Sequence, residues 1–114
     1  MEKVIRDGKV AVLISPDFGG TWGCYSEDNA EALLFDPRVV KLVEERAKGL
    51  LTTELFIERV KTVLDAYYPD EYIASSTIRD LEIKWVDEGT RFILQEYDGL
   101  ESLWLENKLP WRTA

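Results

Sequence analysis

Histidine is absent from this chain of 114 residues, and cysteine occurs only once, as Cys24. Without histidine, Ser-His-Asp catalysis, Cys-His catalysis and every imidazole-containing metal site are excluded within a single chain. A single cysteine forms no internal disulfide and cannot build a zinc site alone. Any chemistry would therefore have to use carboxylates, Lys, Tyr, Ser or Cys24, and the low cysteine content favours a cytoplasmic protein.

Long apolar runs are also missing, and basic residues are outnumbered. No stretch approaches the roughly 18 uninterrupted apolar residues of a membrane span, and charges in the first nine residues argue against a signal peptide. We therefore expect a protein of the cytoplasm with no membrane association. The net charge of −8 opposes a phosphate backbone, which disfavours direct nucleic-acid binding. It is compatible with a basic protein partner or with solubility alone.

The length predicts a single domain over residues 1–114. Residues 9–15 form a short apolar run rich in β-branched side chains, which predicts a central strand buried on both faces. Val4 and Ile5 precede Asp7-Gly8, a favoured two-residue turn, and could form a partner strand. Residues 30–35 fit either a short helix or a strand.

Two helices are predicted in the middle of the chain. Asp36-Pro37 is a typical helix start, and Gly49 is placed to end that helix at about Lys48. Thr52 or Thr53 can cap a second helix that runs to about Tyr67. Each helix is apolar on one face only, so each should lie on a sheet.

The last third of the chain alternates apolar and polar residues, which predicts strands over 81–86, 90–97 and 100–105. A two-residue turn at Asp98-Gly99 pairs Tyr97 with Leu100 and Glu96 with Glu101. The helices should cover the face that carries Phe92, Leu94, Leu103 and Leu105. The predicted fold is α+β, an antiparallel meander with two helices packed on one face, in two layers.

Residues 15–29 form the principal candidate site, a loop longer than most connections. Its glycines let backbone approach a ligand, and its rings offer flat faces for a nucleotide-like molecule. The candidate ligand-binding residues are Phe18, Gly19, Gly20, Trp22, Gly23 and Tyr25. The loop matches neither a phosphate loop nor a dinucleotide fingerprint. Alternatively, its aromatic side chains fold back to cap the core, and Cys24 is then a bystander.

Two carboxylates form a second candidate site. Glu96 and Glu101 face each other in the predicted hairpin, where they could hold a divalent cation or share a proton. The alternative is that they lie at a solvated hairpin tip, where screening makes their repulsion small.

A third candidate is a partner surface made by Arg91, Tyr97 and Trp104 on the hairpin face away from the helices. With Ile93 opposite Trp104, this strip would suit a protein partner or a homodimer. Alternatively, the N-terminal residues or the Pro110-Trp111 tail could fold over it.

Several short motifs together carry a resemblance across almost the whole chain. They are Ile-Ser-Pro-Asp-Phe-Gly at 14–19, Leu-Leu-Phe-Asp-Pro at 33–37, Tyr-Pro-Asp at 68–70, Leu-Glu-Ile-Lys-Trp-Val at 81–86, Glu-Gly-Thr at 88–90 and Glu-Tyr-Asp-Gly at 96–99. This pattern resembles a family of small uncharacterised proteins encoded by bacteriophages. The resemblance assigns no activity, but it implies an accessory protein acting in an infected bacterium.

The sequence therefore favours a non-enzymatic binding protein that needs no cofactor and that sequesters a nucleotide-like ligand or engages a host protein. One alternative is a small metal-dependent hydrolase that uses Glu96 and Glu101. Another is an acidic mimic of nucleic acid that blocks a host protein by charge.

Overall fold

The computed structural model describes residues 2–16, 22–23, 29–97 and 100–105. Helices and antiparallel strands make an α+β fold, as the sequence predicts. The elements in chain order are β1 (Ile5–Arg6), β2 (Lys9–Ile14), α1 (Ala30–Phe35), α2 (Pro37–Ala47), α3 (Thr53–Tyr67), α4 (Ser75–Arg79), β3 (Glu82–Asp87), β4 (Phe92–Tyr97) and β5 (Leu100–Leu105). Within these residues, no helix combines the length and apolar character needed to cross a membrane.

Strand β2 is the centre of the fold. It pairs with β1 on one side and with β3 on the other, both antiparallel. The β1–β2 turn is built by Asp7 and Gly8, which have φ angles of 53° and 75°. Two successive positive φ values are typical of the tight turn whose twist matches an antiparallel pair. All residues of β2 after Lys9 are buried, which confirms the predicted central strand.

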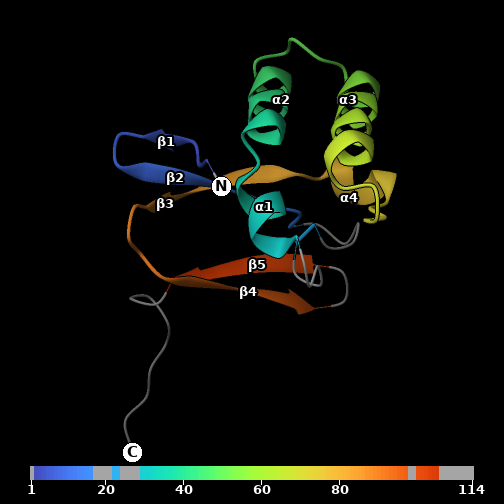
Figure 1. The fold of residues 1–114 in the computed structure, drawn as a ribbon. Coiled ribbons are helices and arrows are strands. Elements are labelled where there is room, and N and C mark those ends of the chain that lie inside the picture. The colour runs from blue at the N-terminus through green and yellow to red at the C-terminus, as the bar shows by residue number, and fades with distance from the viewer. Residues whose placement is uncertain (1, 17–21, 24–28, 98–99, 106–114) are drawn as a thin grey trace, which may run out of the picture.

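The two faces of β2 belong to two separate hydrophobic clusters. Ala11 and Leu13 point toward α2 and α3, where they meet buried residues such as Val40, Phe56 and Val60. The opposite face carries Val10, Val12, Ile14 and, from β3, Val86. The chain therefore has the helices α2 and α3 above this sheet and the hairpin β4–β5 below it (Figure 1).

The meander predicted for the last third of the chain is wrong in its connection. Strand β3 pairs with β2 over the full length of both strands. Among the described residues, β4 pairs only with β5, in a separate sheet. The face with Phe92, Leu94, Leu103 and Leu105 is packed against a cluster, but the three-stranded sheet covers it and the helices do not. Since β2 is apolar on both faces, it needs a cover on each, and the hairpin supplies the second one.

The predicted helix ends are confirmed. Asp36 accepts hydrogen bonds from the backbone N–H groups of Arg38 and Val39 at the start of α2. At its end, Gly49 has a φ of 77°, and the Gly49 and Leu50 N–H groups bond to the Arg46 and Glu45 carbonyls. This pair of bonds is the Schellman arrangement that a glycine permits.

Two short helices complete the fold. The structure shows residues 30–35 as helix α1, which the sequence left open between helix and strand. The sequence pattern does not indicate helix α4. This helix is fixed to the end of β2 because the buried Ser15 hydroxyl donates to the Thr77 carbonyl at 3.0 Å.

Asp36 does more than cap α2. Its carboxylate is completely buried and accepts from the Arg38 guanidinium at 2.8 Å and from the Tyr68 hydroxyl at 2.6 Å. Since Tyr68 follows directly after α3, this carboxylate ties the start of α2 to the end of α3. Burial alone would raise the pKa of Asp36, but the hydrogen bonds from Arg38 and Tyr68 hold it below its ordinary value. Burial and the bond to Asp36 raise the pKa of Tyr68 to about 12.

Because the folded state lowers the pKa of Asp36, the folded protein holds this proton less tightly than the unfolded chain. The carboxylate's contribution to stability is therefore complete above the unfolded pKa of about 3.9 and is lost as pH falls through the folded value. We predict that Asp36→Asn lowers the free energy of unfolding at about pH 7 and that its deficit against the wild type shrinks at about pH 3. Urea unfolding at both pH values measures this.

Thr52→Ala provides the control, because it removes the cap of α3, where Thr52 accepts from the Leu55 N–H at 3.2 Å, without removing a titrating group. Its deficit of about 1 kcal/mol should not change with pH. A deficit of Asp36→Asn that stays constant with pH would contradict the role assigned to the Asp36 charge.

Candidate functional site

The loop at 15–29 is described only in part. Phe18, Gly19, Gly20 and Tyr25, four of the predicted ligand-binding residues, lie outside the described residues, as does Cys24. Their assignment stays a prediction. The described part of the loop includes Trp22 and Gly23, which have well-defined surroundings.

Trp22 is part of the hydrophobic core. Its side chain is only 2% exposed, and its indole N–H donates to the Leu33 carbonyl at 2.8 Å. At Gly23, an added Cβ would lie 3.1 Å from the Leu34 side chain, so the absence of a side chain allows this close approach to α1. Trp22 therefore takes the core-capping role that the sequence left open. A ring buried in this way has no free face on which a nucleobase could stack, which corrects its assignment as a ligand-binding residue.

The predicted hairpin register is confirmed, with Glu96 opposite Glu101 and Tyr97 opposite Leu100 along the backbone. The side chains of these four residues lie outside the described ones. A metal site at Glu96 and Glu101 therefore stays a prediction. Elsewhere in the described part of the chain, no group of three or more acidic or cysteine side chains could hold a metal ion.

The outer face of the hairpin β4–β5 carries exposed apolar side chains. Ile93 and Trp104 are directly opposite each other and are 49% and 39% exposed. The Trp104 indole N–H donates to the Ser102 hydroxyl at 3.0 Å, which holds the ring along β5. Arg91, just before β4, is exposed as well. Arg91 and Trp104, two of the three predicted partner-surface residues, are thus exposed in or next to the hairpin.

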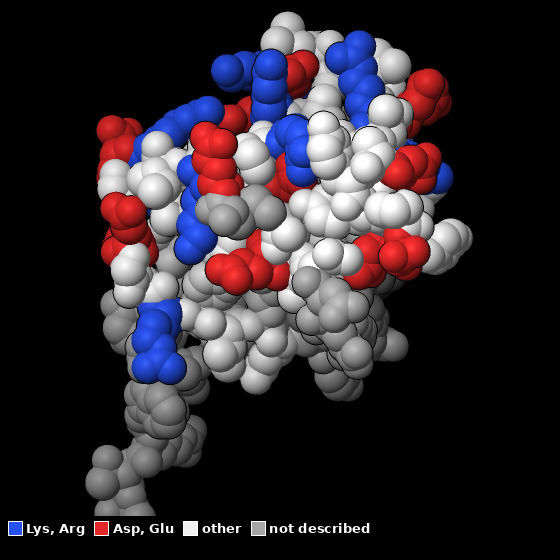
Figure 2. Space-filling view, viewed as in Figure 1, with Lys and Arg blue, Asp and Glu red and all other residues white. Residues whose placement is uncertain are grey.

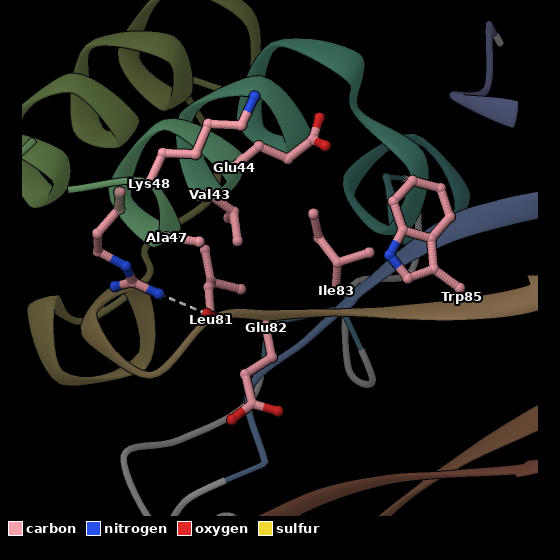
Figure 3. Close-up of a pocket in the computed structure, with 9 residues that line it drawn as sticks. Val43, Glu44, Ala47, Lys48, Leu81, Glu82, Ile83 and Trp85 are labelled. Atoms are coloured by element: carbon pink, nitrogen blue, oxygen red, sulfur yellow. Dashed lines mark hydrogen bonds between the residues drawn. The ribbon is translucent and has the colours of Figure 1, made fainter. Parts of the chain in front are cut away.

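Strand β3 provides a second candidate surface, which the sequence did not indicate. It is the last strand of its sheet, and its outer edge pairs with no other strand among the described residues. A groove of about 550 Å³ lies between this edge and the last turns of α2 (Figure 3). The groove is lined by Val43, Glu44, Arg46, Ala47, Lys48, Leu81, Glu82, Ile83 and Trp85.

A second groove, of about 470 Å³, lies on the other face of β3. Its lining comes from β3, from β5 and from the end of β2, and consists of Ile14, Pro16, Lys84, Trp85, Val86, Ser102, Leu103 and Leu105. Trp85 lines both grooves and is 39% exposed. The edge of β3 is therefore flanked on both faces by largely apolar space.

The backbone N–H and C=O groups of every second residue of β3 point toward β2. One hydrogen bond just beyond the end of β3 shows which residues these are. The Glu88 N–H donates to the Gly8 carbonyl at 2.8 Å, two residues beyond the Val86–Val10 pair. In an antiparallel ladder, bonded and non-bonded pairs alternate, so the even-numbered residues of β3 bond to β2. The N–H and C=O groups of Ile83 and Trp85 consequently point outward, along the unpaired edge.

Arg46 fixes the groove between α2 and the β3 edge. Its guanidinium donates to the Arg79 and Leu81 carbonyls at 2.7 and 2.6 Å and lies 3.9 Å from the centre of the Phe56 ring. Burial lowers the pKa of this guanidinium. Since these bonds join α2 to the residues just before β3, both walls of the groove are fixed to each other.

Charges around these surfaces are mixed in sign. Lys84 lies 3.8 Å from Glu82 on β3, and Arg6 forms an ion pair with Glu44 and lies 5.7 Å from the Trp85 ring. On the face seen in Figure 2, acidic and basic side chains are interspersed. That face does not carry the continuous acidic field that a mimic of nucleic acid would use.

Comparisons of the chain with protein-family models, curated proteins and solved structures found no match. The resemblance to small bacteriophage proteins therefore stays a prediction from the sequence motifs.

The core position of Trp22 can be tested by stability. We predict that Trp22→Ala lowers the free energy of unfolding by about 3–5 kcal/mol, because it leaves a large cavity. Trp22→Phe keeps much of the packing and should cost less, about 1–2 kcal/mol, since it chiefly leaves the Leu33 carbonyl without its donor. Urea unfolding measures both.

Tyr72→Ala is the matched control, because Tyr72 is an aromatic side chain that is almost fully exposed. It should change the stability by less than about 0.5 kcal/mol. Trp22→Ala with an equally small effect would place the Trp22 ring outside the core and restore it as a ligand-binding candidate.

Proposed function

We propose that this protein is a non-enzymatic binding protein that engages a partner protein through the outer face of the hairpin β4–β5. The observation that carries the proposal is the exposed pair of Ile93 and Trp104, directly opposite each other on that face. Exposed aromatic and aliphatic side chains that adjoin each other, next to an arginine such as Arg91, are typical of the energetic centre of a protein interface.

The position of this face favours a protein over a small ligand. The inner face of the hairpin is occupied by the core, since Phe92, Leu94, Leu103 and Leu105 pack on β2 and β3. The outer face is thus the exposed side of a hairpin whose base is fixed. An exposed apolar pair on a β-surface suits another protein, whereas small ligands need a concave site that encloses most of their surface.

The charge of the chain adds a preference for the partner's sign. With a net charge of −8, the protein would associate faster with a partner that is basic around its contact surface. The resemblance to bacteriophage accessory proteins suggests that such a partner is a protein of the bacterial host. Capture of a nucleotide-like ligand is less well supported, because Trp22 is buried.

We predict that Trp104→Ala weakens partner binding by at least about tenfold, because a central tryptophan commonly contributes 2 kcal/mol or more. Ile93→Ala should weaken it by a smaller factor. The full chain would be used to isolate the partner from a bacterial lysate, and the purified partner would then be titrated with each variant by calorimetry.

Tyr72→Ala again serves as the control, since it removes an exposed aromatic ring that lies outside the hairpin. It should bind as the wild type does. A purified partner that binds Trp104→Ala and Ile93→Ala as tightly as the wild type would contradict a contact through this face.

A further inference from the structure

We propose that the outer edge of β3 pairs with the β3 strand of a second copy of this chain, in antiparallel orientation, to form a homodimer with one continuous sheet. Three independent features of the described residues support this: outward backbone groups, the order of charges along β3, and the groove beside it. The surface is distinct from the outer face of the hairpin, so the dimer would carry two of those faces.

The backbone of β3 is prepared for another strand. The N–H and C=O groups of Ile83 and Trp85 point away from β2, and no described strand pairs with them. An unpaired edge of six residues is a template for strand addition. The opposite edge of the sheet is formed by β1, which has only two residues and offers much less backbone.

Charges along β3 select one register. With Ile83 opposite the Ile83 of the second copy, each Glu82 faces a Lys84 of the other chain. The two nearest registers that keep the same backbone groups paired are reached by sliding one strand by two residues. One of them places Glu82 opposite Glu82, and the other places Lys84 opposite Lys84. Opposite charges facing each other across strands stabilise the pair, and like charges destabilise it. The short motif Glu82-Ile83-Lys84 is thus complementary to itself when read antiparallel.

The same register fits the groove between α2 and β3. The Trp85 of the second copy falls opposite Leu81, at the groove lined by Val43 and Ala47. In Figure 3 the side chains of Val43 and Ala47 point from α2 toward those of Leu81 and Ile83. The groove on this side of the β3 edge has a volume of about 550 Å³. Each tryptophan would therefore bury its exposed surface in the other chain.

The proposed pairing between the two β3 strands ends at Leu81. The Leu81 N–H already donates to the Ile78 carbonyl at 3.1 Å, so it cannot pair with a second strand. The Leu81 carbonyl accepts from Arg46 and has a second lone pair for the Trp85 N–H of the other copy. Pairing thus consists of the two bonds between the Ile83 residues and one bond at each Leu81 carbonyl.

Sedimentation velocity of the full chain tests the proposal over concentrations up to about 1 mM. The wild type should form a dimer whose dissociation constant lies within that range. Glu82→Lys and Lys84→Glu should each weaken the dimer by about tenfold, because each variant places like charges opposite each other at two symmetric positions. An equimolar mixture of the two variants should recover wild-type affinity, since lysines in one chain then face glutamates in the other.

Glu58→Lys, a charge reversal on the exposed face of α3, is the control and should leave the dimer unchanged. Thermal melting of each variant shows that the fold is retained. A wild type that stays monomeric throughout would overturn the proposal. A dimer that tolerates Glu82→Lys, or a mixture of the two variants that stays monomeric, would overturn the β3 register. None of these outcomes bears on partner binding by the hairpin.

Discussion

The fold depends on one constraint, namely that β2 is apolar on both faces and must be covered on both. The helices α2 and α3 bury Ala11 and Leu13, and the hairpin β4–β5 buries Val10, Val12 and Ile14. Two different kinds of layer thus meet on a single six-residue strand. Because the hairpin is needed as a cover, it lies outside the main sheet, and β3 is left as the edge. The outer hairpin face and the β3 edge, the two candidate surfaces, both follow from this arrangement.

Local signals allowed much of the fold to be predicted from the sequence. Asp7-Gly8, Asp36-Pro37 and Gly49 each fix a turn or a helix end through the backbone conformation of a few neighbouring residues. The pairing of β4 with β5 is equally local, since two residues join them, and its register was predicted correctly. The partner of β3 was not, because alternation shows which face of a strand is apolar but does not show which strand lies beside it.

The candidate surfaces also differ in whether local sequence signals are enough to find them. The exposed strip with Ile93 and Trp104 followed from the hairpin register alone, so the sequence was enough to find it. The burial of Trp22 depends on the position of α1, and the grooves beside β3 depend on α2 and β5, which come from distant parts of the chain. Asp36 was recognised as a helix cap, but its contact with Tyr68 could not be seen in the spacing of the two residues. Long-range packing set each of these features.

The most direct test of the edge position of β3 is amide hydrogen exchange along that strand, measured by NMR at low and high protein concentration. If β3 is an edge strand, protection alternates in dilute solution, with the Lys84 and Val86 N–H groups protected by β2 and the Ile83 and Trp85 N–H groups exchanging freely. At high concentration the Ile83 and Trp85 groups should become protected as a second β3 pairs with them. Equal protection of all four groups in dilute solution would contradict the edge position of β3, because β3 would then have a neighbour on both sides within one chain.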